Sequence, residues 1–317
     1  MTKICVLCGG VGAARFLRGL MRIVDPDEIT AVVNTADDMR LHGLAISPDL
    51  DTCTYTVAEV INPETGWGLI GETWQAKETL DLYGGQTWFG LGDRDLGTHL
   101  YRTQRLDEGA TLAQVTDEII KAWGIEIRIV PMSNDPVRTE VTIAGGETID
   151  FQRYFVERQH SDVVSHVNFA GVDKSTPAPG VLDAIAAADC VVIAPSNPFV
   201  SIDPILSVPG IRQAVLERRT RNVAISPIVG GGAIKGPAAD LMRSFGHQVS
   251  AAGVAAIYEP LAAHLVIDSV DQGLANAVRQ AGMTPHVTNT MMTSIEITSA
   301  LAEFTLSAID PELHRSH

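Results

Sequence analysis

ICVLCGGVGAAR at residues 4–15 and ITAVVN at residues 29–34 decide the fold of this chain. The apolar run Ile4–Leu7 predicts a strand, the glycine turn is followed by helical spacing over Ala13–Ile23, and Ile29–Val33 predicts a second strand. Apolar runs without alternation are typical of strands that are buried on both faces of a parallel sheet. The N-terminus therefore predicts a β-α-β unit, the building block of a doubly wound fold.

The same alternation of short apolar runs and longer helical segments continues along the chain. Further strands are expected at 125–130, 163–169, 190–194 and 223–226, and helices at 112–123 and 237–245. We therefore predict an α/β fold with a doubly wound, mostly parallel, Rossmann-like sheet. In such a sheet the ligand lies at the carboxyl ends of the strands, so the residues that directly follow each apolar run are the most informative.

Two segments depart from this alternation. Residues 52–123 predict a mainly helical insertion near the ligand site, with helices at 52–61, 72–83, 98–106 and 112–123. Residues 140–149, with Gly145-Gly146 at their centre, predict a small β-hairpin. A terminal helix is expected at 293–309 and a frayed tail at 311–317. We expect residues 1–317 to form a single α/β domain that carries the insertion.

The composition of the chain limits the classes of function that it can have. The chain has 317 residues, 45% hydrophobic and 19% charged, which is typical of a globular protein with a buried core. Its formal net charge is -15, so we expect no nucleic acid or membrane partner, and any bound phosphate needs a local site. No export signal or membrane-spanning run is recognised, and we expect a cytoplasmic protein. Cys5 and Cys8 form a C-x-x-C, but on a strand they point to opposite faces, which suits neither metal nor redox chemistry.

A glycine turn follows the first strand. Gly9, Gly10 and Gly12 would let backbone amides approach a phosphate, and the start of the following helix favours an anion. NAD is disfavoured, because Arg15 occupies the third glycine position of the dinucleotide fingerprint and Asn34 stands where a ribose-binding acid is expected. Close packing of the turn is the alternative to phosphate binding.

Four carboxylates follow the second strand, those of Asp37, Asp38, Asp49 and Asp51. Hard oxygen ligands suit Mg²⁺, which often binds through one or two carboxylates together with substrate phosphates. Asp51 could instead be the N-cap of the helix that begins at Thr52. One helix start does not explain the other three acids, so we predict a magnesium site in this loop.

A third motif contains Trp88, Phe89, Asp93 and Arg94 beside a glycine turn. The aromatic rings could stack on a flat ligand while Arg94 meets a phosphate. The alternative is a buried aromatic pair next to a surface ion pair. His42 and His99 lie next to these motifs and could line the site, and the alternative is the structural or surface position that a lone histidine more often has.

Two polar loops follow later strands. Ser196 and Asn197 follow the run at 190–194, and Lys235 follows the run at 223–226 and a glycine-rich turn. These residues offer hydroxyl, amide and ammonium donors at strand ends. Their convergence with the glycine turn predicts a nucleotide site, with Gly9, Gly10, Gly12, Ser196, Asn197 and Lys235 around the phosphates.

Six motifs in the same order resemble the 2-phospho-L-lactate transferase family of the CofD/FbiA type. They are Gly9-Gly10-x-Gly12-Ala13, Asn34-Thr35-x-Asp37-Asp38, Ser47-Pro48-Asp49-Leu50-Asp51-Thr52, Leu91-Gly92-Asp93-Arg94-Asp95, Pro195-Ser196-Asn197-Pro198, and Ser226-Pro227 with Lys235-Gly236-Pro237. The resemblance spans residue 3 to about residue 268.

The resemblance implies a magnesium-dependent transferase of coenzyme F-420 biosynthesis. A phospholactyl, phosphoenolpyruvyl or phosphoglyceryl group would pass from a guanosine diphosphate-linked donor to the ribityl hydroxyl of the deazaflavin FO, with release of GMP. The family's contact to deazaflavin and metal falls on Asp51, and a side-chain contact made by some relatives falls on Gly90, which has no side chain. We expect Asp51 and Arg94 to be catalytic, and Asp51, Trp88, Phe89 and Asp93 to bind FO.

Two other functions stay open at this point. A non-catalytic, nucleotide-sugar-binding regulator of the YvcK type shares the first strand, loop and helix, but here Met39–Gly43 replaces its glycine- and serine-rich continuation. An NAD-dependent oxidoreductase is the weaker alternative. The identity of the three-carbon acid and the oligomeric state, with a homodimer as one option, are not fixed by the sequence.

Overall fold

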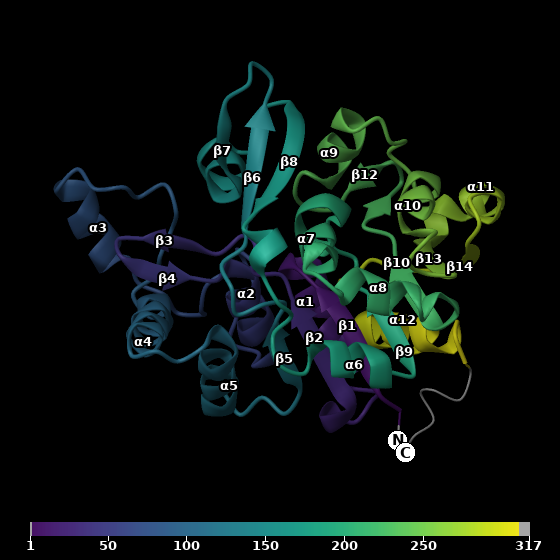
Figure 1. Cartoon of the computed structure of the whole chain (residues 1–317), viewed down its shortest axis with the longest axis horizontal. Helices are drawn as coiled ribbons and strands as arrows, with labels where there is room; N and C mark the ends of the chain where they lie inside the picture. The colour runs from purple at the N-terminus through teal and green to yellow at the C-terminus, as the bar shows by residue number, and fades with distance from the viewer. Residues whose placement is uncertain (1, 311–317) are drawn as a thin grey trace.

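The central sheet has seven parallel strands in a computed structural model that describes residues 2–310. Its order is β14 (Thr284–Thr288), β13 (His264–Asp268), β10 (Asn222–Ile225), β9 (Cys190–Ile193), β1 (Ile4–Cys8), β2 (Ile29–Val33) and β5 (Arg128–Pro131). Every neighbouring pair is parallel. The predicted α/β class is confirmed, and Figure 1 shows the sheet in the lower half of the molecule.

Helices cover both faces of the sheet. One face carries α1 (Gly10–Leu20), α2 (Pro48–Val57) and α12 (Ile295–Ser307), and the other carries α6 (Val181–Ala187), α7 (Asp203–Ser207), α8 (Ile211–Leu216), α9 (Ala238–Ser244), α10 (Ala251–Tyr258) and α11 (Ala275–Gln280). Alternate residues of β1 enter the two cores, so Cys5 and Cys8 point to opposite faces as predicted, and both are free thiols. The continuous apolar runs therefore supply two cores at once.

The small sheets lie outside this core. They are β3 (Met39–Leu41) with β4 (Leu44–Ile46), β6 (Arg138–Ile143) between β7 (Thr148–Asp150) and β8 (Val164–Ala170), and β11 (Ile228–Val229) with β12 (Gly232–Ala233), all antiparallel. The hairpin at 140–149 is present. The run at 163–169 was expected in the parallel sheet, which is wrong: polar Ser165, His166 and Asn168 interrupt it, and as β8 it pairs with β6.

The segment 52–123 contains the expected helices with shifted ends. They are α2, α3 (Gln75–Leu82), α4 (Asp95–Asp107) and α5 (Leu112–Ala122), and residues 58–74 and 83–94 between them contain no helix. In Figure 1 the β3–β4 hairpin and α3 project to the left and the β6–β7–β8 sheet projects to the top. The tail at 311–317 lies outside the described residues. Within residues 2–310, no helix has the length and apolar character needed to span a membrane.

Candidate functional site

Loops that follow three strands of the central sheet are joined by hydrogen bonds at its carboxyl edge. After β1 and β9, the Gly9 amide donates to Oγ of Ser196 at 3.2 Å and the Ser196 hydroxyl donates to the Gly9 carbonyl at 2.7 Å. After β2, Nδ2 of Asn34 donates to Oδ2 of Asp49 at 3.0 Å. The sheet order reverses between β1 and β9. These motifs therefore meet where open α/β sheets bind their ligands.

The glycine turn after β1 serves close packing. Gly10 has a left-handed backbone with φ of 70°, and its amide donates to Oδ1 of Asp49 at 2.9 Å. A Cβ on Gly9 or Gly12 would lie 2.5 Å from another atom, which at Gly12 is the Pro195 carbonyl oxygen. Close packing, the alternative that the sequence left open, therefore accounts for Gly9 and Gly12. The Gly10 amide is already taken by Asp49, so the amides of Val11 and Gly12 are the groups of this turn that can meet another anion, because helix geometry gives them no intrahelical partner.

Asn197 and Lys235 lie at the same edge of the sheet. Oδ1 of Asn197 accepts from the Phe199 amide at 3.0 Å, whereas its Nδ2 is buried with no hydrogen-bond partner among residues 2–310. Lys235 is exposed, and its Nζ lies 3.1 Å from the place where a Cβ of Gly66 would stand. A side-chain carbon of Val11 lies 3.8 Å from the same place. Lys235 is therefore close to the first turn of α1, where its charge can reach a bound anion.

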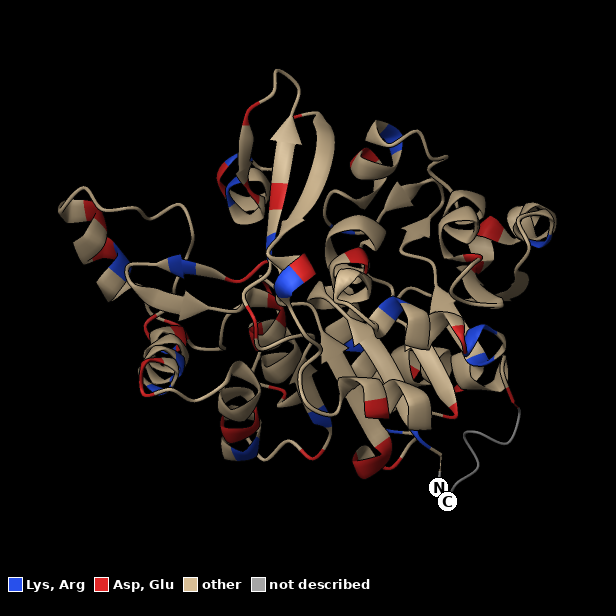
Figure 2. Ribbon diagram, in the orientation of Figure 1, with Lys and Arg blue, Asp and Glu red and all other residues tan. Residues whose placement is uncertain are grey.

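Asp37 is buried and Asp38 half-buried in the loop between β2 and β3, and Asp49 is buried in the first turn of α2. Figure 2 shows acidic residues along the chain that leads into the β3–β4 hairpin. Burial raises the pKa of Asp38 to about 8 and that of Asp49 to about 6, and it also raises the pKa of Asp37. Gly10 and Asn34 satisfy Asp49, but Oδ1 of Asp37 and Oδ1 of Asp38 have no hydrogen-bond partner in the described part of the chain. Such oxygens fit a divalent cation, since its charge offsets the cost of their desolvation.

Asp51 lies inside α2. The helix begins at Pro48 with Ser47 at its N-cap, so the interpretation of Asp51 as a cap is wrong. Both carboxylate oxygens of Asp51 accept hydrogen bonds from the Arg102 guanidinium, one of them at 3.1 Å. The side chains of Arg102 and Asp51 are only 2% and 9% exposed. Arg102 is thus the buried counter-ion of Asp51, the residue to which the family resemblance assigns the contact with deazaflavin and metal.

Asp95 and His99 of α4 extend this buried network. Nε2 of His99 lies 3.3 Å from Oδ2 of Asp95, and Nδ1 of His99 lies 3.8 Å from Oδ2 of Asp51. Among the described residues, Asp51, Asp95 and His99 are the one group of three acids, histidines or cysteines whose ligand atoms lie within 4.8 Å of one another. The sequence reasoning gave Asp95 no role and overlooked Arg102. Their spacing of 95, 99 and 102 on one helix face was the signal that could have found them.

Asp93 and Arg94 hold in place an arm of the insertion, which comprises residues 70–82 and contains α3. Asp93 accepts hydrogen bonds from the first two amides of α3, each at 3.0 Å. Glu72, which precedes α3, accepts from the amides of Arg94 and Asp95 at 2.8 and 3.0 Å. The Arg94 guanidinium donates to the Ile70 carbonyl. The two carboxylates therefore cap each other's helices, and these contacts of Asp93 and Arg94 are with the arm.

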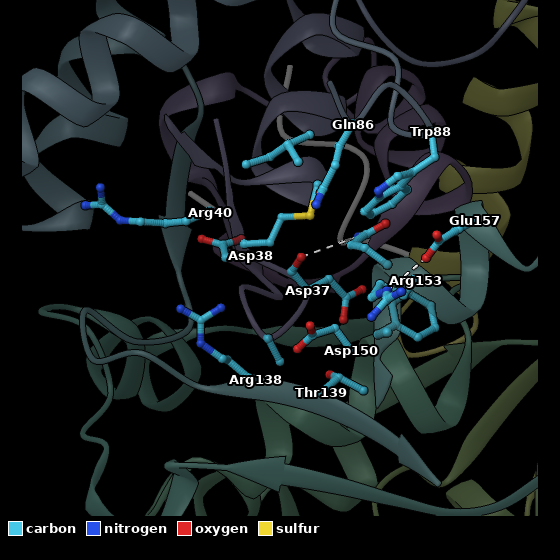
Figure 3. A pocket seen from close by; sticks show the side chains of 15 residues that line it. Asp37, Asp38, Arg40, Gln86, Trp88, Arg138, Thr139, Asp150, Arg153 and Glu157 are labelled. Carbon is cyan, nitrogen blue, oxygen red and sulfur yellow. Dashed lines mark hydrogen bonds and ion pairs between the residues drawn. The ribbon is translucent and has the colours of Figure 1, made fainter. Parts of the chain in front are cut away.

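A cavity of about 370 Å³ opens beside the acidic loop. Figure 3 shows Trp88 on one side, Arg138 on the opposite side, and Asp37 and Asp38 between them. Trp88 also packs edge-to-face on Phe89, with ring centroids 5.9 Å apart. The volume is in the range of small-molecule sites, about 300–1,000 Å³. The two carboxylates, the Arg138 guanidinium and the Trp88 ring thus line the same cavity.

Comparison with known proteins identifies the family of this chain. The family model described as 2-phospho-L-lactate transferase CofD matches residues 4–303. A phosphoenolpyruvate transferase of Kitasatospora aureofaciens is 43% identical over 321 residues, covering 99% of this chain and 100% of that protein. Another from Mycobacterium sp. (strain JLS) is 46% identical over 264 residues, covering 77% and 80%.

A solved structure supports the fold alone. A protein of the UPF0052 family from Bacillus halodurans superposes with a TM-score of 0.65 at 18% identity, covering 96% of this chain and 98% of that one. The family assignment rests on the sequence matches, which extend through all six motifs. The chain therefore belongs to the 2-phospho-L-lactate transferase CofD family and is a transferase of phosphate-containing groups.

Proposed function

We propose that this chain transfers a three-carbon phospho-acid group from a guanosine diphosphate-linked donor to the ribityl hydroxyl of FO in coenzyme F-420 biosynthesis, releasing GMP. The observation that carries the proposal is the pair of buried, unpaired carboxylate oxygens of Asp37 and Asp38, in the loop after the strand that neighbours β1. The similarity to phosphoenolpyruvate transferases favours the enolpyruvyl donor over the lactyl and glyceryl ones. It also favours a transferase over the regulator and the oxidoreductase.

The proposed step forms one bond and breaks one. The hydroxyl oxygen of FO bonds to the phosphorus that carries the three-carbon acid, and the bond from that phosphorus to the bridging oxygen breaks. GMP leaves with the bridging oxygen, and a carboxylate of the acidic loop takes the hydroxyl proton. Such transfers need neutralised phosphate oxygens and an in-line hydroxyl more than covalent help from the protein.

The donor diphosphate would lie over the first turn of α1. The amides there, Nδ2 of Asn197 and Nζ of Lys235 are the donors that its oxygens would meet, and Ser196 holds the turn in shape. With a net charge of -15, the protein needs such local donors to hold a polyanion. Close packing at Gly12 supports this placement as well, because it fixes α1 against the loop after β9.

Magnesium would be held by Asp37 and Asp38, whose unpaired oxygens fit it. Asp49 already accepts two hydrogen bonds and Asp51 already pairs with Arg102, so we place these two at the edge of the metal site. The ion would neutralise phosphate oxygens of the donor. Trp88 and Phe89 would line the FO site on the other side of the cavity.

The test is incubation of the protein with FO, MgCl₂ and each of the three guanylylated acids. GMP release and the mass of the deazaflavin product are measured, with EDTA and Asp38→Asn as controls. We expect product with the enolpyruvyl donor above all, and little product in either control. A folded protein that releases no GMP with any of the three donors would refute the proposal.

A further inference from the structure

The buried face of α4 is polar, and His99 lies at its centre. The buried residues of this helix are Asp95, His99 and Arg102, and all three are ionisable. Their spacing places them along one side of the helix, and Arg102 contacts Asp51 of α2. Burial of such groups is costly unless each finds a partner. A helix that buries only ionisable residues departs from the usual apolar pattern, and such departures are expected at functional sites.

The contact with Arg102 fixes the tautomer of the His99 ring. Nη1 of Arg102 lies 3.3 Å from Nδ1 of His99. A guanidinium can only donate, so Nδ1 accepts the hydrogen bond and carries no proton. The proton of the neutral ring is therefore on Nε2, which lies 3.3 Å from Oδ2 of Asp95 but is not aligned for a hydrogen bond within residues 2–310. Nδ1 is thus the ring atom that binds His99 into the network.

Arg102 presents the end of its guanidinium to Asp51. Nη1 donates to Oδ2 of Asp51 at 3.1 Å, and Nη2 donates to Oδ1. Nε of Arg102 is buried without a hydrogen-bond partner in the described part of the chain. Nη1 has two further acceptors, Nδ1 of His99 and the Ala45 carbonyl at 3.4 Å. These two acceptors oppose a turn of the guanidinium that would bring Nε to the carboxylate.

We propose that His99 is a positioning residue of the transfer reaction, because its Nδ1 holds the Arg102 guanidinium end-on against Asp51. The inference rests on the proposed function, in which Asp51 stands at the edge of the metal site. A contact of two parallel hydrogen bonds with arginine fixes the plane of a carboxylate. Each oxygen of Asp51 keeps a second lone pair for a ligand, and the direction of that lone pair follows from the plane. His99 itself is 1% exposed, so it acts through Arg102.

A metal ion held by His99 itself is the alternative. Ligand atoms of Asp51, Asp95 and His99 lie within 4.8 Å of one another. The Arg102 guanidinium, however, already donates to both oxygens of Asp51 and to Nδ1 of His99. Its charge would also repel a cation at this place. The geometry therefore favours positioning over coordination.

The test compares three substitutions of His99. In His99→Asn the amide oxygen stands near the place of Nδ1 and can accept from Arg102, whereas in His99→Gln the amide reaches the place of Nε2. His99→Leu has no acceptor. His286→Leu is the matched control, because His286 is hydrogen-bonded to His264 at 3.0 Å on the edge strand β14. In Figure 1, β14 lies on the right and α4 on the left.

Both the reaction and the ring are measured. We expect His99→Leu and His99→Gln to lower kcat about 10–100-fold, the usual effect of losing a residue that orients a ligand side chain. The KM for FO should change less than kcat, because the orientation of Asp51 matters most in the transition state. His99→Asn and His286→Leu should retain most of the activity. In ¹⁵N NMR of histidine-labelled protein, the signals that His99→Asn removes should show a neutral ring with its proton on Nε2.

Each of four results would overturn a different part of the inference. If His99→Asn is as impaired as His99→Leu, the acceptor at Nδ1 is not what the reaction needs. A ring that carries its proton on Nδ1 does not accept from Arg102. Loss of the Nε2 proton on addition of ZnCl₂ would assign His99 to a metal. If wild type converts FO and His99→Leu does so equally well, positioning alone is refuted, whereas a wild type that converts no FO refutes the proposed function as well.

Discussion

Removal of the buried counter-ion of Asp51 should destabilise the protein strongly. Arg102→Met keeps the length of the side chain but leaves the Asp51 carboxylate, 9% exposed, without its guanidinium. Breaking a buried ion pair in this way costs about 3–5 kcal/mol, because one charge remains uncompensated. At an unfolding entropy of about 2.1 cal/mol/K per residue, a chain of this length should lose about 4–8 °C in Tm.

The same helix supplies a control. Arg105 pairs with Glu118, and these side chains are 30% and 33% exposed, so Arg105→Met should cost only about 0.2–1 kcal/mol. Both variants are compared with wild type by thermal unfolding, followed by circular dichroism in EDTA. The double variant Arg102→Met with Asp51→Asn should recover part of the lost Tm, because it removes the orphaned charge.

The measurement separates a buried pair from an incidental contact. If Arg102→Met and Arg105→Met unfold within about 2 °C of each other, Arg102 does not compensate Asp51. A double variant that is no more stable than Arg102→Met would refute the reasoning about the orphaned charge, even if the single variant is unstable.

Two other predictions concern the acidic loop and the glycine turn. Burial raises the pKa of Asp38 to about 8, so the stability gained by protonation is present at low pH and is lost as pH rises through that value. The Tm of the metal-free protein should therefore fall between pH 6.5 and 8.5. MgCl₂ should raise the Tm more at pH 8.5 than at pH 6.5. A metal-free Tm that rises over this interval would contradict the raised pKa of Asp38. Gly12→Ala should destabilise by about 1–3 kcal/mol, since its Cβ would lie 2.5 Å from the Pro195 carbonyl oxygen. Gly97→Ala in α4, where no atom lies within 4 Å of the new Cβ, should be neutral or stabilising in the same denaturant titration.

The sequence determined those strands and helices that a pattern of residues within the segment itself predicts. Continuous apolar runs predicted β1, β2, β9 and β10 to within a residue or two, because a strand buried on both faces needs apolar residues at every position. It also indicated which loops form the candidate site, since polar motifs follow those strands directly. The helices α4 and α5 were predicted from the 3.6-residue period, with ends shifted by up to three residues.

The tertiary structure decided how those pieces contact one another. Arg102 lies 51 residues from Asp51 along the chain and resembles any surface arginine of a polar helix, so only the packing of α4 on α2 makes it a counter-ion. Asp93 and Arg94 suggested a ligand site, yet they face an arm whose position no local pattern encodes. Gly12 has no room for a side chain, because the Pro195 carbonyl, in the loop after the neighbouring strand β9, lies 2.5 Å from where its Cβ would stand. Local periodicity records which face of an element is apolar, but the partner that meets a polar residue is set by contacts between segments far apart in the chain.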